Sequence, residues 1–152
     1  MAEPARQVPS VTATVPLRSR RFGDHEVPVD RVLTFPDGIV GFPAARRFAL
    51  LEAARPGSPF RCLACLDLPE LGFVVCEPEA LWPGYTAELP LPEGVPAAEM
   101  VVLAIVTVPA DPTAMTANLM APLVVECATR TGHQLVLDTG RFTTRQPIFA
   151  RP

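Results

Sequence analysis

Proline is the feature that most constrains this sequence, because its 19 copies are spread over the whole chain of 152 residues. An interior proline removes a backbone donor and clashes with the preceding turn, which costs a helix about 3 kcal/mol. No long segment keeps a helical period without meeting a proline, so any helix is limited to about one to three turns. The sequence therefore argues against a helical bundle.

Short apolar or β-branched runs alternate with turn sequences from Val27 onward, which is the pattern of an all-β chain. The turn Phe35-Pro36-Asp37-Gly38-Ile39 combines a proline that presets φ, an aspartate that bonds nearby backbone and a glycine that accepts positive φ. Similar turns are expected at 67–70, 91–94 and 130–133. We predict seven or more strands, in the segments 29–35, 48–51, 60–66, 72–76, 100–108, 123–127 and 134–138.

The run from Val101 to Val108 is apolar on both faces, and an open sheet with one face in water could not bury it. A nearly closed antiparallel barrel could, and the chain length suits one domain. We therefore predict an all-β fold, a small antiparallel β-barrel-like single domain with few short helical turns. Residues 1–19 are expected to form a flexible N-terminal arm, with a weak β pattern near 12–17, and residues 20–150 the β domain.

The charged residues are unevenly distributed along the chain. All 13 basic residues are arginine, and together with 16 acidic residues they give a net charge of -3. No arginine lies between Arg61 and Arg130, where nine acidic residues lie without a basic neighbour in sequence. These acids are Asp67, Glu70, Glu77, Glu79, Glu88, Glu93, Glu99, Asp111 and Glu126. They form either a solvated acidic face or a surface that steers a basic partner, and neither suits a nucleic-acid binder.

The usual residues of catalytic and metal sites are sparse. The four cysteines lie in apolar contexts, so we expect buried free thiols in a reducing cytosol. Cys62 and Cys65 are spaced like a metal pair, but a second pair is missing and residues three apart on a strand point to opposite faces. We expect no metal, no cofactor and no catalytic residue, with His25 and His133 on the surface. An enzyme with a Cys-His pair is the alternative hypothesis.

Two further expectations concern location. Residues 1–16 lack the basic start and apolar core of a secretory signal. The longest apolar run is much shorter than the roughly 20 residues that a membrane span requires. We therefore expect a cytoplasmic protein without a membrane partner.

The segment 111–122 joins two apolar strands with hydroxyl side chains, an asparagine and bounding prolines. Asp111 with Pro112 could cap a single helical turn, and Asn118 can bond nearby backbone. One interpretation is structural, because threonine and asparagine side chains satisfy loop backbone groups that would otherwise be buried without partners. The other is a surface that contacts a partner.

A series of short motifs runs through the chain in a fixed order. The motifs are Phe22-Gly23, Leu33-Thr34-Phe35, Gly38-Ile39-Val40-Gly41-Phe42-Pro43, Arg47-Phe48-Ala49-Leu50, Pro59-Phe60, Asp67-Leu68-Pro69, Phe73, Thr107-Val108, Thr116-Ala117-Asn118-Leu119-Met120-Ala121-Pro122, Gly132-His133-Gln134 and Thr143-Thr144-Arg145-Gln146-Pro147-Ile148. In this order and spacing, over roughly residues 20–149, the chain resembles the FliW family of bacterial flagellar assembly factors. The resemblance implies a small antiparallel β-barrel-like fold, in agreement with the strand pattern.

The resemblance also implies a function without catalysis. FliW-like proteins bind CsrA, a dimeric RNA-binding regulator, and relieve its repression of flagellin mRNA, while flagellin competes for the same protein. This implies binding to a state of CsrA that cannot bind RNA, without direct contact with nucleic acid. We expect a monomer. The residues Ala64-Cys65-Leu66, Phe142 and Gln146 differ from those frequent in the family, so a flagellin-binding chaperone without CsrA control is the second hypothesis.

Six residues are the expected contacts with protein partners, three acids from the acidic stretch, two residues of the linker 111–122 and one aromatic of a turn. They are Phe42, Asp67, Glu70, Glu77, Asn118 and Leu119. The acids would attract the arginine and lysine side chains of an RNA-binding protein, whereas Phe42 and Leu119 could equally belong to the core. Changing Asp67 and Glu70 together to arginine is expected to slow CsrA binding and to leave stability nearly intact.

Overall fold

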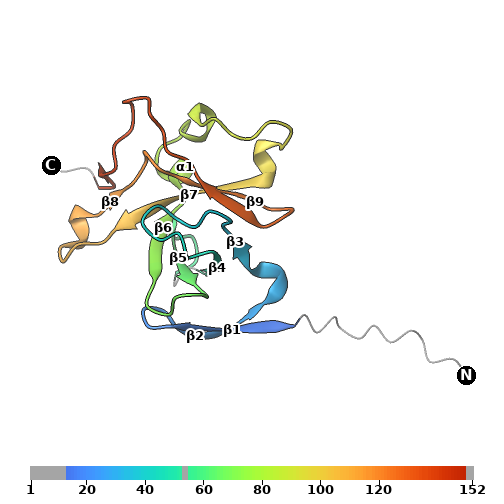
Figure 1. Cartoon of the computed structure of the whole chain (residues 1–152). Coiled ribbons are helices and arrows are strands. Elements are labelled where there is room, and N and C mark those ends of the chain that lie inside the picture. Colours follow the sequence, from blue (N-terminus) through green and yellow to red (C-terminus); the bar gives the residue numbers. More distant parts are fainter. Residues whose placement is uncertain (1–12, 53–54, 150–152) are drawn as a thin grey trace, which may run out of the picture.

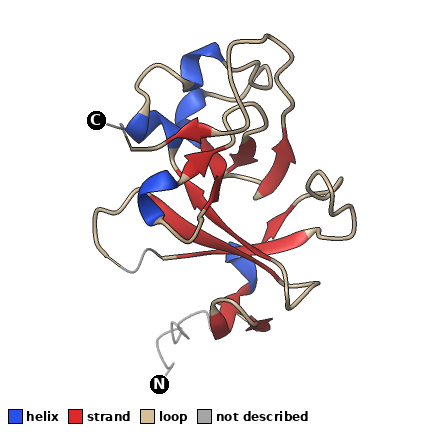
Figure 2. Cartoon of the chain, turned by 90° about the vertical axis from the view of Figure 1, so that its left-hand side faces the viewer, coloured by secondary structure: helices blue, strands red, loops and turns tan. Residues whose placement is uncertain are grey.

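The computed structural model describes residues 13–52 and 55–149, and strands dominate it (Figures 1 and 2). The strands are β1 Thr14–Ser19, β2 Gly23–Pro28, β3 Leu33–Thr34, β4 Arg47–Leu51, β5 Phe60–Cys65, β6 Gly72–Cys76, β7 Met100–Thr107, β8 Thr116–Ala117, β9 Leu123–Glu126, β10 Thr131–Gln134 and β11 Gln146–Pro147. The helical turns are α1 Pro78–Leu81, η1 Val29–Arg31, η2 Thr86–Glu88, η3 Ala97–Glu99 and η4 Pro112–Ala114. Among the described helices, none has the length and apolar character to cross a membrane.

Within the described chain, seven strands close into a barrel in the order β7, β6, β5, β4, β3, β10 and β9. The ring closes because Met100–Leu103 at the start of β7 also pairs with β9. The neighbouring strands are antiparallel except for β3 and β10, which are parallel at Thr34 and Thr131. β8 and β11 extend the sheet from the far end of β7. The all-β, barrel-like fold predicted from the sequence is confirmed.

Strand β7 separates two apolar cores, which explains why both of its faces are apolar. Leu103, flanked by Val101 and Ile105, packs with the residues that fill the barrel. Val102 and Ala104 face the opposite way, into a cluster formed by the loops that cover the barrel. Burying a valine or leucine side chain stabilises a fold by about 1.5–3 kcal/mol, so both faces contribute to stability.

A third cluster lies beneath the β1–β2 hairpin, at the bottom of the molecule in Figure 1. Leu17 and Val27 of the hairpin pack on Ala49 of β4 and Ala64 of β5, and Leu17 has no exposed surface. Residues 14–19, which the sequence placed in an N-terminal arm, are therefore part of the folded domain. The alternation of exposed and buried residues in β1 is the signal for this strand. The rest of the expected arm, residues 1–12, lies outside the described residues.

The strand expected at 29–35 begins later and is shorter than predicted. Val29–Arg31 forms the turn η1, because the amide of Val32 bonds back to the carbonyl of Val29 over 3.3 Å. Only Leu33–Thr34 of this segment pairs as a strand, with β4 on one side and β10 on the other. The apolar residues of 29–35 did not show in the sequence which part forms the tight turn and which part forms the strand.

The strand expected at 134–138 lies earlier in the chain, at Thr131–Gln134, so the turn expected at 130–133 was wrong. The chain reverses before Thr131, where Arg130 adopts a φ of 55° and its amide bonds to the Glu126 carbonyl over 2.8 Å. Gly132 serves packing rather than turning, because a Cβ there would lie 2.5 Å from the ring of Phe35. A threonine-glycine pair therefore resembled a turn although it lies in a strand.

Candidate protein interaction surface

Asp67 ties two segments of the backbone together. Its Oδ2 accepts the amides of Arg46 over 3.1 Å and Arg47 over 2.8 Å, and its Oδ1 lies 2.9 Å from the Arg47 guanidinium. Partial burial alone would raise the pKa of Asp67, but the hydrogen bonds from Arg47 and Arg46 and the Arg47 charge outweigh it and hold the pKa below its ordinary value. Asp67 is therefore a structural acceptor, and changing it to arginine is expected to lower stability.

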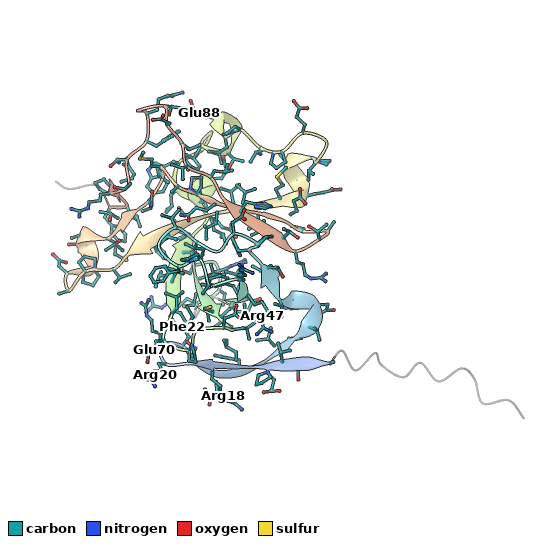
Figure 3. All side chains as sticks on the ribbon, viewed as in Figure 1. Arg18, Arg20, Phe22, Arg47, Glu70 and Glu88 are labelled. Atoms are coloured by element: carbon teal, nitrogen blue, oxygen red, sulfur yellow. The ribbon has the colours of Figure 1, made fainter. Side chains whose placement is uncertain are left out.

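Glu70 lies at the same end of the barrel and pairs with Arg20 of the turn between β1 and β2, over 3.0 Å (Figure 3). About three quarters of both side chains is exposed, so this ion pair contributes at most about 1 kcal/mol. The amide of Arg20 also bonds to the carbonyl of Pro69 over 2.9 Å. The charge of Glu70 is accessible, but an arginine already lies beside it.

Phe42 lies in the loop before β4 and leaves 40% of its surface exposed. Its ring packs edge-on against Phe73, with centroids 5.9 Å apart. Val40 and Leu68 are exposed as well, so apolar side chains reach solvent from this loop and from the β5–β6 turn.

Asn118 and Leu119 serve the fold. The Asn118 side chain accepts the amides of Met120 over 3.1 Å and Ala121 over 3.0 Å, which is the loop-satisfying role expected of asparagine. Leu119 is buried, its amide bonds to the Thr143 carbonyl over 3.1 Å, and its carbonyl accepts the Tyr85 hydroxyl over 2.6 Å. Leu119 thus has a core environment instead of the exposed position that a contact residue requires.

Glu77 follows β6 at the opposite end of that strand from Asp67 and Glu70, so the three acids do not share one face. It lies 3.6 Å from the guanidinium of Arg61, and both side chains are partly exposed. Glu88 likewise pairs with Arg141. Within the described chain, four of the nine acids that lack a basic neighbour in sequence therefore pair with arginines through the fold.

A groove of about 570 Å³ lies beside Glu77, between the outer face of β7 and the segment 77–99. Apolar side chains of Leu89, Leu91 and Met100 line it, and Glu77 and Glu79 lie on its edge. This groove was not predicted from the sequence. The available signal was the alternation of leucines with prolines and acids in 77–99, which only the fold brings against β7.

The groove edge carries a fixed negative charge at Glu79. Its carboxylate accepts the amides of Gly84 over 2.6 Å and Thr86 over 2.9 Å. These hydrogen bonds lower the pKa of Glu79, so the group is anionic at neutral pH.

The cysteines are free, and their environments differ. Cys65 and Cys76 are buried and Cys62 is half-buried, but Cys127 is exposed, so the expectation of a buried thiol was wrong there. Cys127 lies in the turn that follows β9, outside the barrel. Burial raises the pKa of Cys62 and Cys65, and that of Cys76 to about 12, which leaves neutral thiols of low reactivity. In residues 13–52 and 55–149, no group of three His, Cys, Asp or Glu side chains could hold a metal ion.

Of the residues that depart from the resembled family, two are buried and three, Leu66, Phe142 and Gln146, are partly exposed. Ala64 and Cys65 have no exposed surface. The Phe142 ring packs edge-on against Tyr85 with centroids 5.0 Å apart. The departures at Ala64 and Cys65 therefore alter internal packing, whereas Phe142 and Gln146 line a surface hollow and remain accessible to a partner.

Comparisons with known sequences point to one family. The family model described as FliW protein matches residues 16–148. The flagellar assembly factor FliW of Bdellovibrio bacteriovorus is 38% identical over 141 residues, which cover 89% of this chain and 79% of that protein. The flagellar assembly factor FliW of Symbiobacterium thermophilum is 36% identical over 126 residues, which cover 80% of this chain and 91% of that protein.

A solved structure shows the same similarity in three dimensions. A crystal structure described as that of the flagellar assembly factor FliW matches with a TM-score of 0.79 at 28% identity, covering 90% of this chain and 99% of that chain. The part of the sequence matched by the family, residues 16–148, contains the barrel strands and most of the β1–β2 hairpin. The similarity therefore extends over the folded domain.

Proposed function

Because the chain belongs to the FliW family of flagellar assembly factors, we propose that it acts by binding other proteins, with CsrA and flagellin as its partners. In this proposal it binds CsrA in a state that cannot bind RNA, and so relieves repression of flagellin mRNA. Free flagellin competes for it. The chain works as a monomer in the cytoplasm, makes no contact with RNA and performs no reaction.

The observation that carries the proposal is the extent of the family match, residues 16–148. A net charge of -3 also supports it, because an RNA-binding partner is rich in arginine and lysine. The energy required is modest. A 100-fold loss of RNA affinity needs a coupling free energy of about 2.7 kcal/mol between the two binding events.

A competition experiment with purified proteins of the same organism tests the proposal. CsrA is bound to the leader RNA of flagellin, and the chain is added at increasing concentration while bound RNA is followed by mobility shift. We expect the RNA to be released, and flagellin added last to restore the CsrA–RNA complex. RNA that stays bound at saturating concentration would contradict the proposal. Binding of flagellin without binding of CsrA would support the chaperone hypothesis instead.

Charge attraction between the partners makes a separate prediction. The association rate of the chain with CsrA should fall as salt is raised, while the dissociation rate changes little, because screening acts on the approach of the two proteins. Surface plasmon resonance at two ionic strengths measures both rates. An association rate independent of salt would remove electrostatic steering from the proposal.

A further inference from the structure

The groove between β7 and the segment 77–99 has the composition of a binding site for a peptide segment. Its apolar lining includes Leu89, Leu91 and Met100, and its volume of about 570 Å³ has room for several large side chains. Ala87 and Ala97 also line it and are exposed, so small side chains form part of its rim. Grooves with an apolar floor and polar edges are how proteins hold amphipathic segments of their partners.

The segment 77–99, which forms one wall of the groove, is held in place by contacts with the rest of the fold. Glu79 closes the turn at 84–86 through two amide hydrogen bonds, of 2.6 and 2.9 Å. The Tyr85 hydroxyl donates to the buried carbonyl of Leu119 over 2.6 Å, and Glu88 pairs with Arg141 near the top of the molecule in Figure 3. The groove is therefore already formed, and a ligand need not spend binding energy on ordering it.

The charge around the groove selects the sign of a ligand. The segment 77–99 contains five glutamates and no basic residue. Arg61 and Arg141 pair with two of them, Glu77 and Glu88. Among the described residues, Glu79, Glu93 and Glu99 have no ion-pair partner. These three carboxylates give the segment a net negative charge, so a basic ligand is attracted and an acidic one is repelled.

We propose that this groove binds a short amphipathic segment of a protein partner, with apolar side chains in the groove and arginine or lysine side chains beside the glutamates. The inference rests on the proposed function in one respect, that the partner is a protein. It places the contact at the end of the barrel away from Asp67 and Glu70, where arginines already neutralise the acids.

Two synthetic peptides probe the groove with the full chain. Both carry leucines at helical spacing; one has arginines on its polar face and the other has glutamates there. We expect the arginine peptide to bind in fluorescence anisotropy and the glutamate peptide to bind at least tenfold more weakly. In the Ala97→Trp variant, which fills the mouth, we expect at least a tenfold loss of affinity for the arginine peptide. The matched control is Ala44→Trp, an exposed alanine elsewhere, which should bind like wild type.

Charge is tested separately. Reversing Glu93 and Glu99 together to arginine should weaken the arginine peptide severalfold and strengthen the glutamate peptide. The control reverses Asp24 and Asp30, which are exposed and lie in or just after the β1–β2 hairpin, away from the groove, and should change neither affinity. Urea denaturation of each variant confirms that it is folded.

The outcomes separate this inference from the proposed function. Equal affinity of Ala97→Trp and Ala44→Trp for the arginine peptide would contradict the proposal that the groove binds a peptide, even where CsrA and flagellin bind the wild type. Equal binding of both peptides to wild type, or binding of neither, would overturn it too. Failure of CsrA and flagellin to bind the wild type would refute the proposed function, while the peptides would still decide whether the groove binds.

Discussion

At the scale of single residues, Asp67 shows how one carboxylate can connect distant parts of a chain. It lies in the turn after β5, yet it satisfies two backbone amides at the start of β4 and pairs with the Arg47 guanidinium. Charge-assisted hydrogen bonds of this kind are about twice as strong as neutral ones. The residue is partly exposed, but its main role is to hold the β5–β6 turn against β4.

The Asp67→Asn variant tests this role. It keeps the shape but removes the charge, and we expect the free energy of unfolding to fall by about 1–2 kcal/mol at neutral pH. The folded-state pKa of Asp67 is lowered, so its contribution is complete above the unfolded-state pKa of about 3.9 and is lost as the pH falls through the folded-state value. Urea denaturation at decreasing pH should therefore show the two proteins converge.

Glu70→Gln is the control for that measurement. Glu70 is an exposed acid three residues away with a single surface ion pair, and its loss should cost less than about 0.5 kcal/mol. A cost equal to that of Asp67→Asn, or a stability difference for Asp67→Asn that does not depend on pH, would show that Asp67 has no special structural role.

At the scale of elements, the β9–β10 hairpin shows how packing chooses a residue that also resembles a turn signal. β10 forms the part of the barrel wall that faces the ring of Phe35 in the interior, and Phe35 packs edge-on against Phe48 with centroids 5.4 Å apart. Gly132 is the position in β10 that faces this ring. A strand with a glycine here can approach Phe35 without displacing it.

Gly132→Ala should therefore destabilise the protein strongly. The new Cβ would lie 2.5 Å from Cζ and 2.6 Å from Cε2 of Phe35, whose ring is completely buried and packed against Phe48. Overpacking of this kind costs about 1–3 kcal/mol, and we expect the upper end of that range in urea denaturation. The neighbouring His133→Ala, on the exposed face of the strand, should cost little.

A double variant checks the cause of that loss. Replacing Phe35 by leucine in the Gly132→Ala background should recover part of the stability, because the clash with the ring is removed. Strictly additive losses from the two changes would mean that the clash is not the reason.

At the scale of the whole molecule, the fold is a barrel with two covering layers. The β1–β2 hairpin covers the outer face of β4 and β5, and the loops that follow β6 and β10 cover the outer face of β7 (Figure 1). Each layer adds its own apolar cluster to the one inside the barrel. The chain therefore buries three apolar clusters although none of its strands is longer than eight residues in the described part.

The contribution of the hairpin layer can be measured with Leu17→Ala. Leu17 has no exposed surface, and truncating a buried leucine costs about 2–5 kcal/mol. Thermal and urea denaturation should both show the loss. Arg18→Ala is the control, because this neighbouring side chain points to solvent and its ion pair with Asp24 is 3.8 Å long (Figure 3). Equal stability of both variants and wild type would mean that residues 14–19 are an appendage, as the sequence alone suggested.

Local rules predicted the strands and the fold class well. Prolines limited the helices, alternation and turn chemistry located most strands, and the two apolar faces of 101–108 required cover on both sides. These properties depend on near neighbours in the chain, so they are visible in the order of residues. The same is true of the motifs that indicated the family, which the comparisons confirm.

The environment of each side chain depended on residues that are distant in the chain. Asp67 forms an ion pair with Arg47, and Glu70 forms one with Arg20. Leu119 is bonded through its carbonyl to Tyr85, which lies more than thirty residues away in the chain. Sequence spacing could not show that arginines from elsewhere neutralise these acids, or that a loop and a strand enclose a groove. Charge pairing and burial act through space and depend on which segments the closed barrel brings together, and the ion pairs and the groove were therefore visible only in the folded chain.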